Sequence, residues 1–140
     1  MSNTTPLTPG TLLQNRYRIG RAIGYGGMGA VYEVTDQRLD AHAALKQILR
    51  STPVMREAFE REARLLRNLK HRSLPQVFDY FIEADADFLV MDFIEGPDVA
   101  ELISQQGALP VDQALTWADA LLDVLVYLHT RQPAVIHRDI

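Results

Sequence analysis

A glycine-rich segment followed by a single lysine is the part of this sequence most suited to chemistry. Residues 23–31 read Ile-Gly-Tyr-Gly-Gly-Met-Gly-Ala-Val, and Lys46 ends the later run Ala-Ala-Leu-Lys. Glycine lets backbone N–H groups approach an anion closely, and a nearby lysine adds a fixed positive charge. The combination predicts a binding site for a polyphosphate.

Two other interpretations of the glycines compete with this one. In a dinucleotide-binding fingerprint the glycines open a helix, and an acidic residue follows about 20 positions later. Residues 30–35 are instead rich in β-branched and aromatic side chains, and Asp40 matches the acidic position poorly. Since residues 17–23 also alternate, residues 24–29 are predicted to be the tip of a β-hairpin. A glycine-rich hairpin without any ligand is the second alternative.

Composition excludes several classes of protein. The 140 residues are 47% hydrophobic and 23% charged, which is typical of a globular chain. A net charge of −4 argues against a nucleic-acid partner, and the absence of cysteine excludes disulfides and thiolate zinc sites. No spacing of histidines and acids suggests a metal site. No apolar stretch reaches the length of a membrane span, so we expect no membrane contact and a cytoplasmic location.

The elements that must position the site follow an α+β order. Strands are expected over 17–23, 30–35, 41–49, 76–83 and 87–93. A helix is expected over 53–70, because Thr52 and Pro53 form a favoured helix start. Its apolar stripe consists of Phe59, Ala63, Leu66 and Leu69.

Two more helices are expected, a short one over 99–106 and a long one over 110–131. The apolar stripe of the long helix consists of Ala114, Trp117, Ala118, Leu121, Leu125 and Leu128. Residues 134–136 are expected to be extended, and residues 1–12 to form a disordered leader. Strands followed by helices indicate a small antiparallel sheet with a separate helical layer.

Five motifs follow one another in a fixed order along the chain. They are the glycine-rich loop with Gly24, Gly26, Gly29 and Val31; the strand lysine Lys46; the helix acid Glu62; the run Leu-Val-Met-Asp-Phe-Ile-Glu-Gly over 89–96; and His137-Arg138-Asp139. Over residues 13–140 they resemble the N-terminal half of the domain of eukaryotic-type (Hanks-type) Ser/Thr protein kinases of bacteria. The resemblance implies an N-lobe over 13–95, with a five-stranded antiparallel sheet and one helix. The first helices of a mainly α C-lobe would follow over 96–140.

The resemblance also implies that the chain binds ATP. The backbone of the loop would cover the β- and γ-phosphates, and Lys46 would hold the α- and β-phosphates. The loop consists of Gly24, Tyr25, Gly26, Gly27, Met28 and Gly29. Apolar contacts to the adenine ring would come from Ile23, Val31 and Ala44, with Met91 setting the depth of the slot.

Backbone groups of the hinge would bind the edge of the purine: the carbonyl of Asp92 and the amide of Ile94. Asp98 either reaches the ribose hydroxyls or caps the next helix. Glu62 would form an ion pair with Lys46, and its position four residues before Leu66 places it on the buried side of the helix. Asp139 would accept the proton of the substrate hydroxyl.

In the family, an asparagine later in the catalytic loop and the aspartate of a following Asp-Phe-Gly hold magnesium. The 140 residues contain no Asp-Phe-Gly. We therefore expect Mg²⁺ only with a downstream segment, and no phosphorylation of a protein Ser/Thr substrate by this part alone. Three alternatives stay open: a nucleotide-binding regulatory module or pseudokinase-like remnant, a small-molecule kinase (disfavoured by Arg138, which favours protein substrates), and an interrupted gene product without a role.

Overall fold

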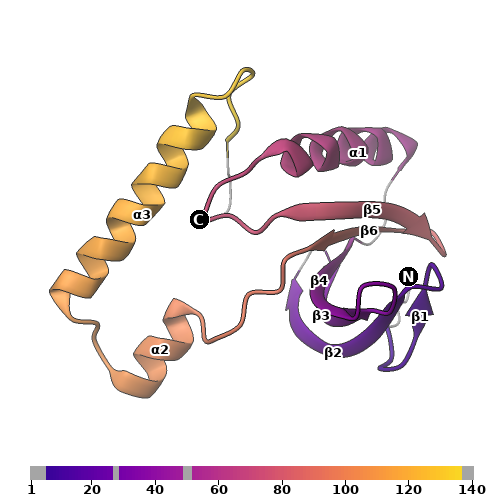
Figure 1. The fold of residues 1–140 in the computed structure, drawn as a ribbon, viewed down its shortest axis with the longest axis horizontal. Helices are drawn as coiled ribbons and strands as arrows, with labels where there is room; N and C mark the ends of the chain where they lie inside the picture. The colour runs from indigo at the N-terminus through magenta and orange to yellow at the C-terminus, as the bar shows by residue number, and fades with distance from the viewer. Residues whose placement is uncertain (1–5, 27–28, 49–51, 137–140) are drawn as a thin grey trace. The chain divides into compact units, whose positions relative to one another are not determined.

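The computed structural model describes residues 6–26, 29–48 and 52–136, and the chain divides into two compact units (Figure 1). The first unit comprises Met1–Lys70 with Pro75–Ile94, and the second comprises His71–Leu74 with Glu95–Ile140. The predicted residues 27, 28 and 137–140, including Gly27, Met28 and Asp139, lie outside the described residues.

The first unit is built on an antiparallel sheet of six strands. They are β1 (Leu12–Leu13), β2 (Tyr17–Gly26), β3 (Gly29–Asp36), β4 (Ala41–Ile48), β5 (Val77–Glu83) and β6 (Ala86–Met91), in the spatial order β1-β2-β3-β4-β6-β5. The five long strands confirm the α+β prediction, and β2 and β3 curl strongly (Figure 1). The count of five was one strand short, because the two residues of β1 are too few to show a periodic pattern.

One face of the curled sheet encloses the main hydrophobic core. Alternate residues of β3 are buried, as expected for a strand with one face in a core. The core consists of Leu13, Tyr17, Ile19, Ala30, Tyr32, Val34, Ala43, Leu45, Ala86, Phe88 and Val90. Leu7 packs against this core, and its backbone N–H donates to the Tyr32 hydroxyl at 3.1 Å. Residue 7 of the expected leader is therefore attached to the sheet.

A partly buried ionic network joins β3 and β5 to the segment before β2. The Arg16 guanidinium lies 2.6 Å from a carboxylate oxygen of Asp36 and 3.5 Å from one of Asp79. The Tyr17 hydroxyl donates to Asp79 at 2.5 Å. Asp36 is 1% exposed, and the hydrogen bond from Arg16 holds its pKa below the usual range. Asp36 thus stays ionised and fixes the end of β3.

Helix α1 (Pro53–Asn68) packs on the other face of the sheet, beside β5 (Figure 1). Thr52 caps it as predicted, since its hydroxyl accepts a hydrogen bond from Met55 N at 3.3 Å. Three residues of the predicted stripe face the sheet, which confirms this part of the prediction. Ala63, with Phe59 and Leu66 packed beside it, forms a second hydrophobic cluster with Val77 and Leu89. The helix ends two residues before the predicted boundary at residue 70, because Leu69 is extended.

The second unit contains α2 (Val99–Gln106) and α3 (Val111–His129), which confirm both predicted helices. His71 supports α3: its Nε2 lies 3.2 Å from Asp123 Oδ2, and its ring centre lies 5.0 Å from that of Tyr127. Residues 134–136, predicted as extended, have no regular structure. In the described parts of the chain, no helix combines the length and apolar character of a membrane span.

The long helix exposes much of its predicted stripe. Leu128 is buried, as is Val124, which the stripe did not include. Ala114, Ala118 and Leu121 of the stripe are exposed, and so are Leu122 and Val126 outside it. This helix therefore presents an exposed apolar surface in the described residues.

Candidate functional site

The glycine-rich segment forms the end of the β2–β3 hairpin. Gly26 and Gly29 are cross-strand partners, so β2 ends and β3 begins on either side of the tip. Gly29 has φ +153°, and a Cβ atom there would lie 1.8 Å from the carbonyl oxygen of Gln47. Glycine is therefore required at this position. A strand, not a helix, starts at Gly29, which excludes the dinucleotide-binding interpretation.

The strand before the tip is irregular and open. Ile23 lies in a register shift of β2, between the pairs Ala22–Tyr32 and Gly24–Val31. Ile23 and Tyr25 are both exposed, and no atom lies within 4 Å of a Cβ added at Gly24. This part of the hairpin has room for a ligand beside its backbone.

Lys46 stands on the face of the sheet opposite the main core. Its cross-strand partners are Val31 on β3 and Leu89 on β6, so their side chains share this face. The next pair along, Ala44 and Met91, lies on the same face. Lys46 is exposed. Among the described residues, no carboxylate oxygen lies within 4.0 Å of its ammonium nitrogen, so Lys46 forms no ion pair with them. The structure thus brings together one ammonium group and an apolar floor.

The segment after β6 leaves two backbone groups open. Asp92 is tied to Gln76 twice: its N–H donates to the Gln76 carbonyl at 3.0 Å, and its carboxylate accepts from Gln76 N at 2.8 Å. Within the described residues, no hydrogen bond occupies the Asp92 carbonyl or the Ile94 N–H. A donor and an acceptor two residues apart therefore remain available for a planar ligand.

Glu62 does not meet Lys46 in this structure. The prediction placed Glu62 on the buried side of α1, but Glu62 is exposed, and no ion pair joins these two described side chains. Ala63 takes the position that faces the sheet, and adjacent helical residues differ by about 100° around the axis. The predicted pair would thus require a different setting of α1.

Asp98 caps α2. Its carboxylate accepts a hydrogen bond from Glu101 N at 2.8 Å, and the Glu101 side chain accepts from Asp98 N at 3.0 Å. This reciprocal arrangement is a capping box, one of the two roles that the sequence left open.

The sequence did not predict a polar cluster on the face of the sheet that carries Lys46, Val31, Ala44, Leu89 and Met91, called the Lys46 face below. Glu33, the partner of Ala44, accepts from Arg21 Nε at 2.7 Å, and His42 Nδ1 lies 3.1 Å from its other oxygen. The hydrogen bond from Arg21 lowers the pKa of Glu33. The alternation of β3 could have shown that Glu33 shares a face with Val31.

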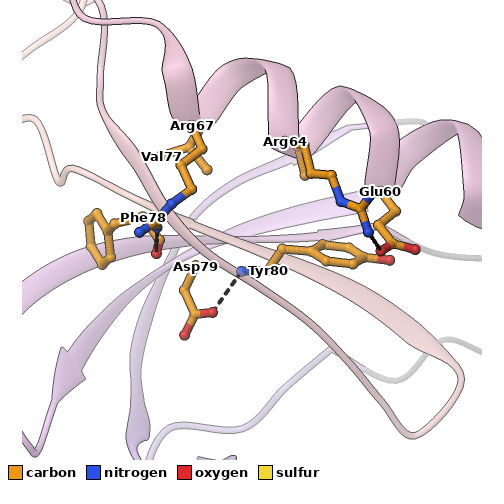
Figure 2. Close-up of a pocket in the computed structure, with 8 residues that line it drawn as sticks. Glu60, Arg64, Arg67, Val77, Phe78, Asp79 and Tyr80 are labelled. Atoms are coloured by element: carbon orange, nitrogen blue, oxygen red, sulfur yellow. Dashed lines mark hydrogen bonds and ion pairs between the residues drawn. The ribbon is translucent and has the colours of Figure 1, made fainter.

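A cavity of about 190 Å³ lies elsewhere, between α1 and β5 (Figure 2). Its lining is Glu60, Ala63, Arg64 and Arg67 from the helix, and Val77, Phe78, Asp79 and Tyr80 from the strand. None of the predicted site residues lines it, so this cavity is not the predicted polyphosphate site. Within the described ranges, no three His, Asp or Glu side chains are grouped as a metal site would need.

Comparison with known proteins defines the class. The sequence model of the protein kinase domain matches residues 17–140, and the chain belongs to this family. The probable serine/threonine-protein kinase YbdM of Bacillus subtilis is 36% identical over 140 residues, covering 96% of this chain and 54% of that protein. The serine/threonine-protein kinase PrkC of the same species is 33% identical over 135 residues, covering 94% of this chain and 20% of that protein.

Solved structures give the same class. The kinase domain of PknI from Mycobacterium tuberculosis superimposes with a TM-score of 0.78 at 27% identity, covering 96% of this chain and 55% of that chain. The predicted resemblance and the kinase-type fold are therefore confirmed. The chain spans about half the length of YbdM and of the PknI kinase domain.

Proposed function

We propose that the Lys46 face binds ATP and that the protein carrying these residues is a serine/threonine protein kinase. The observation that carries this proposal is the placement of Lys46, beside the glycine hairpin and between Val31 and Leu89. An ammonium group on an apolar floor suits a ligand with an anionic tail and a planar ring. The names of the relatives support the choice of serine and threonine hydroxyls.

Each end of the nucleotide has matching groups on this chain. Backbone N–H groups of the hairpin, with Lys46, would bind the phosphates. Val31, Ala44 and Met91 would contact the ring, with Ile23 closing from the hairpin side. The open Asp92 carbonyl and Ile94 N–H would bind the ring edge, as in the sequence prediction.

Glu62 and Asp139 keep their predicted roles within this proposal. Glu62 would hold the Lys46 ammonium once α1 brings the two together, and at about 4 Å such a pair gains about 4 kcal/mol before desolvation. Asp139 would orient the substrate hydroxyl and take its proton. Magnesium supplies charge neutralisation in this class of reaction. Within the described residues, no cluster of carboxylate or histidine side chains fits the metal.

Titration with ATP tests the binding part of the proposal. The chain has only two lysines, so Lys70→Ala is a matched control for Lys46→Ala. We expect Lys46→Ala to weaken ATP binding about 10- to 100-fold, the worth of one charged hydrogen-bonding contact. Lys70→Ala should bind like the unaltered chain. Equal affinity of all three proteins would overturn the assignment of Lys46.

A nucleotide-binding module without catalysis is the second candidate. The missing contact between Lys46 and Glu62 favours it, because active protein kinases need this pair in place. Incubation of the full-length protein with labelled ATP, magnesium and a protein substrate separates the two. Transfer of label that depends on Asp139 supports the kinase, whereas ATP binding without transfer supports the module.

A further inference from the structure

A buried carboxylate on β6 has no role in the proposed ATP site. Asp87 is 0% exposed, and its cross-strand partner is Ile48 on β4. It precedes Leu89, the partner of Lys46, by two residues on the same strand. Because side chains two apart on a strand share a face, Asp87 lies on the same face of the sheet as Lys46.

Side chains from β5 and α1 converge on Asp87. The Tyr80 hydroxyl donates to its Oδ1 at 3.0 Å, and Arg56 Nε lies 3.8 Å from its Oδ2. The Tyr80 ring also packs on Phe59 of α1, with ring centres 5.6 Å apart. Arg56 and Phe59 belong to the first half of the helix, so this cluster ties that half to the β5–β6 hairpin.

The contacts of Asp87 favour one setting of α1, because a buried carboxylate requires its hydrogen-bonding and ionic partners. Removing a hydrogen-bonding or ionic partner from a buried charge is strongly unfavourable. Asp87 therefore favours the setting of α1 that keeps Arg56 within reach. Arg56 also lies 3.6 Å from Asp85, but that carboxylate is fully exposed and contributes little by comparison.

A helix is stiff, so fixing its first half also fixes the direction of Glu62. Arg64, on the other side of Ala63 from Glu62, lines the cavity of about 190 Å³ between α1 and β5, with Glu60 and Arg67 beside it (Figure 2). Rotation of the helix toward that cavity would turn Glu62 toward the sheet. The structure thus contains both an attachment that resists this rotation and space that would accept it.

We propose that Asp87 is a positioning residue that, through Arg56 and Tyr80, holds α1 in the setting where Glu62 and Lys46 are unpaired. Weakening this attachment releases the helix and raises the fraction of molecules in which residues 46 and 62 approach each other. The proposal rests on the proposed function, because it concerns the lysine–glutamate pair of the ATP site.

Thiol cross-linking measures this approach directly. The chain contains no cysteine, so Lys46→Cys with Glu62→Cys supplies the only two thiols. The rate of linking by a short bifunctional maleimide is measured in this background and after addition of Asp87→Asn. We expect Asp87→Asn to raise the rate at least about threefold through a shift in population. Arg56→Gln should do the same, whereas Arg56→Lys, which keeps the charge, should have a smaller effect.

The matched control is Asp85→Asn, which removes the exposed carboxylate beside Arg56 and should leave the rate unchanged. Hydrogen exchange of β2, β3 and β4 checks that the sheet is intact in each variant. If Asp87→Asn does not fold, Tyr80→Phe, which removes one hydrogen bond to Asp87, and Arg56→Gln decide the question. An unchanged or lower cross-linking rate in those of Asp87→Asn, Tyr80→Phe and Arg56→Gln that fold would overturn the proposal.

The cross-linking measurement distinguishes a failure of this proposal from a failure of the proposed function. Cross-linking reports the position of α1 without any nucleotide, so a failure of ATP binding leaves this measurement intact. Conversely, tight ATP binding together with an unchanged linking rate would overturn only the role of Asp87.

Discussion

A Cβ atom at Gly29 would lie 1.8 Å from the carbonyl oxygen of Gln47. Gln47 follows Lys46 on β4, so the first residue of β3 packs directly on the strand that carries the lysine. The start of β3 and the strand that carries the lysine are thereby packed closely together. The glycine at this position serves the backbone of the sheet, in addition to any ligand.

Gly29→Ala should destabilise the first unit. The new methyl group would displace the Gln47 backbone, and φ +153° is rarely adopted by alanine, so we expect a loss of about 2–3 kcal/mol in the free energy of unfolding. Urea denaturation measures it. Gly24→Ala is the matched control, because nothing lies within 4 Å of its Cβ, and its stability should stay within about 1 kcal/mol. Equal stability of the two variants would contradict the close approach.

Asp36→Asn should lower the free energy of unfolding more than the substitution of an exposed aspartate does. Asp36 is 1% exposed and bound by the Arg16 guanidinium, whose charge would remain without its main partner. We expect a loss of about 3 kcal/mol in the free energy of unfolding at neutral pH. The exposed Asp40 supplies the control, Asp40→Asn, which should have little effect. A similar stability of both variants would show that the network does not stabilise the fold.

The Asp36 carboxyl group also predicts that the stability of the fold depends on pH in the acid range. Arg16 and the backbone N–H of Arg38 lower the pKa of Asp36, so the ionised form is favoured in the folded state. Its contribution is present above the ordinary aspartate pKa of about 3.9 and is lost as pH falls through the lower folded value. The stability difference between the unaltered chain and Asp36→Asn should therefore shrink below about pH 4. A constant difference down to the acid transition would disprove this linkage.

The Tyr80 hydroxyl predicts that the stability of the fold depends on pH in the alkaline range. Burial, and then the hydrogen bond to Asp87, raise the pKa of Tyr80 to about 12 from 10.0. The neutral phenol is favoured in the folded state, so its contribution is complete below pH 10 and is lost as pH approaches 12. Tyr80→Phe should remove this part of the alkaline loss of stability. Phenolate absorbance of the two proteins checks it, and a tyrosine at residue 80 that ionises near pH 10 would contradict it.

Much of the fold could be predicted because its elements carry strong local patterns. The alternation in β3, the cap at Thr52 and the apolar stripe of α1 each reflect a single element and its core face. The glycines and Lys46 were found for the same reason, since turn chemistry and strand register are local properties. The short strand β1 was not predicted, because its pairing with β2 depends on tertiary contacts.

The setting of α1 could not be predicted from its own sequence. The spacing of Glu62 from Leu66 suggested the buried face, yet Ala63 and Phe59 occupy it. The choice depends on partners far along the chain, above all Tyr80 and Asp87, whose contacts with the helix leave no periodic signal. A buried aspartate inside an apolar strand is visible in the sequence, but its partners are not.

The central claim is that Lys46 faces a bound nucleotide, and a lysine-reactive acyl-phosphate analogue of ATP tests it most directly. The two lysines of the chain make the result unambiguous when the labelled peptides are identified by mass spectrometry. We predict that Lys46 is modified, that excess ATP protects it, and that Lys70 reacts slowly and without protection. Equal labelling of both lysines, or labelling of Lys46 that ATP does not reduce, would contradict the account.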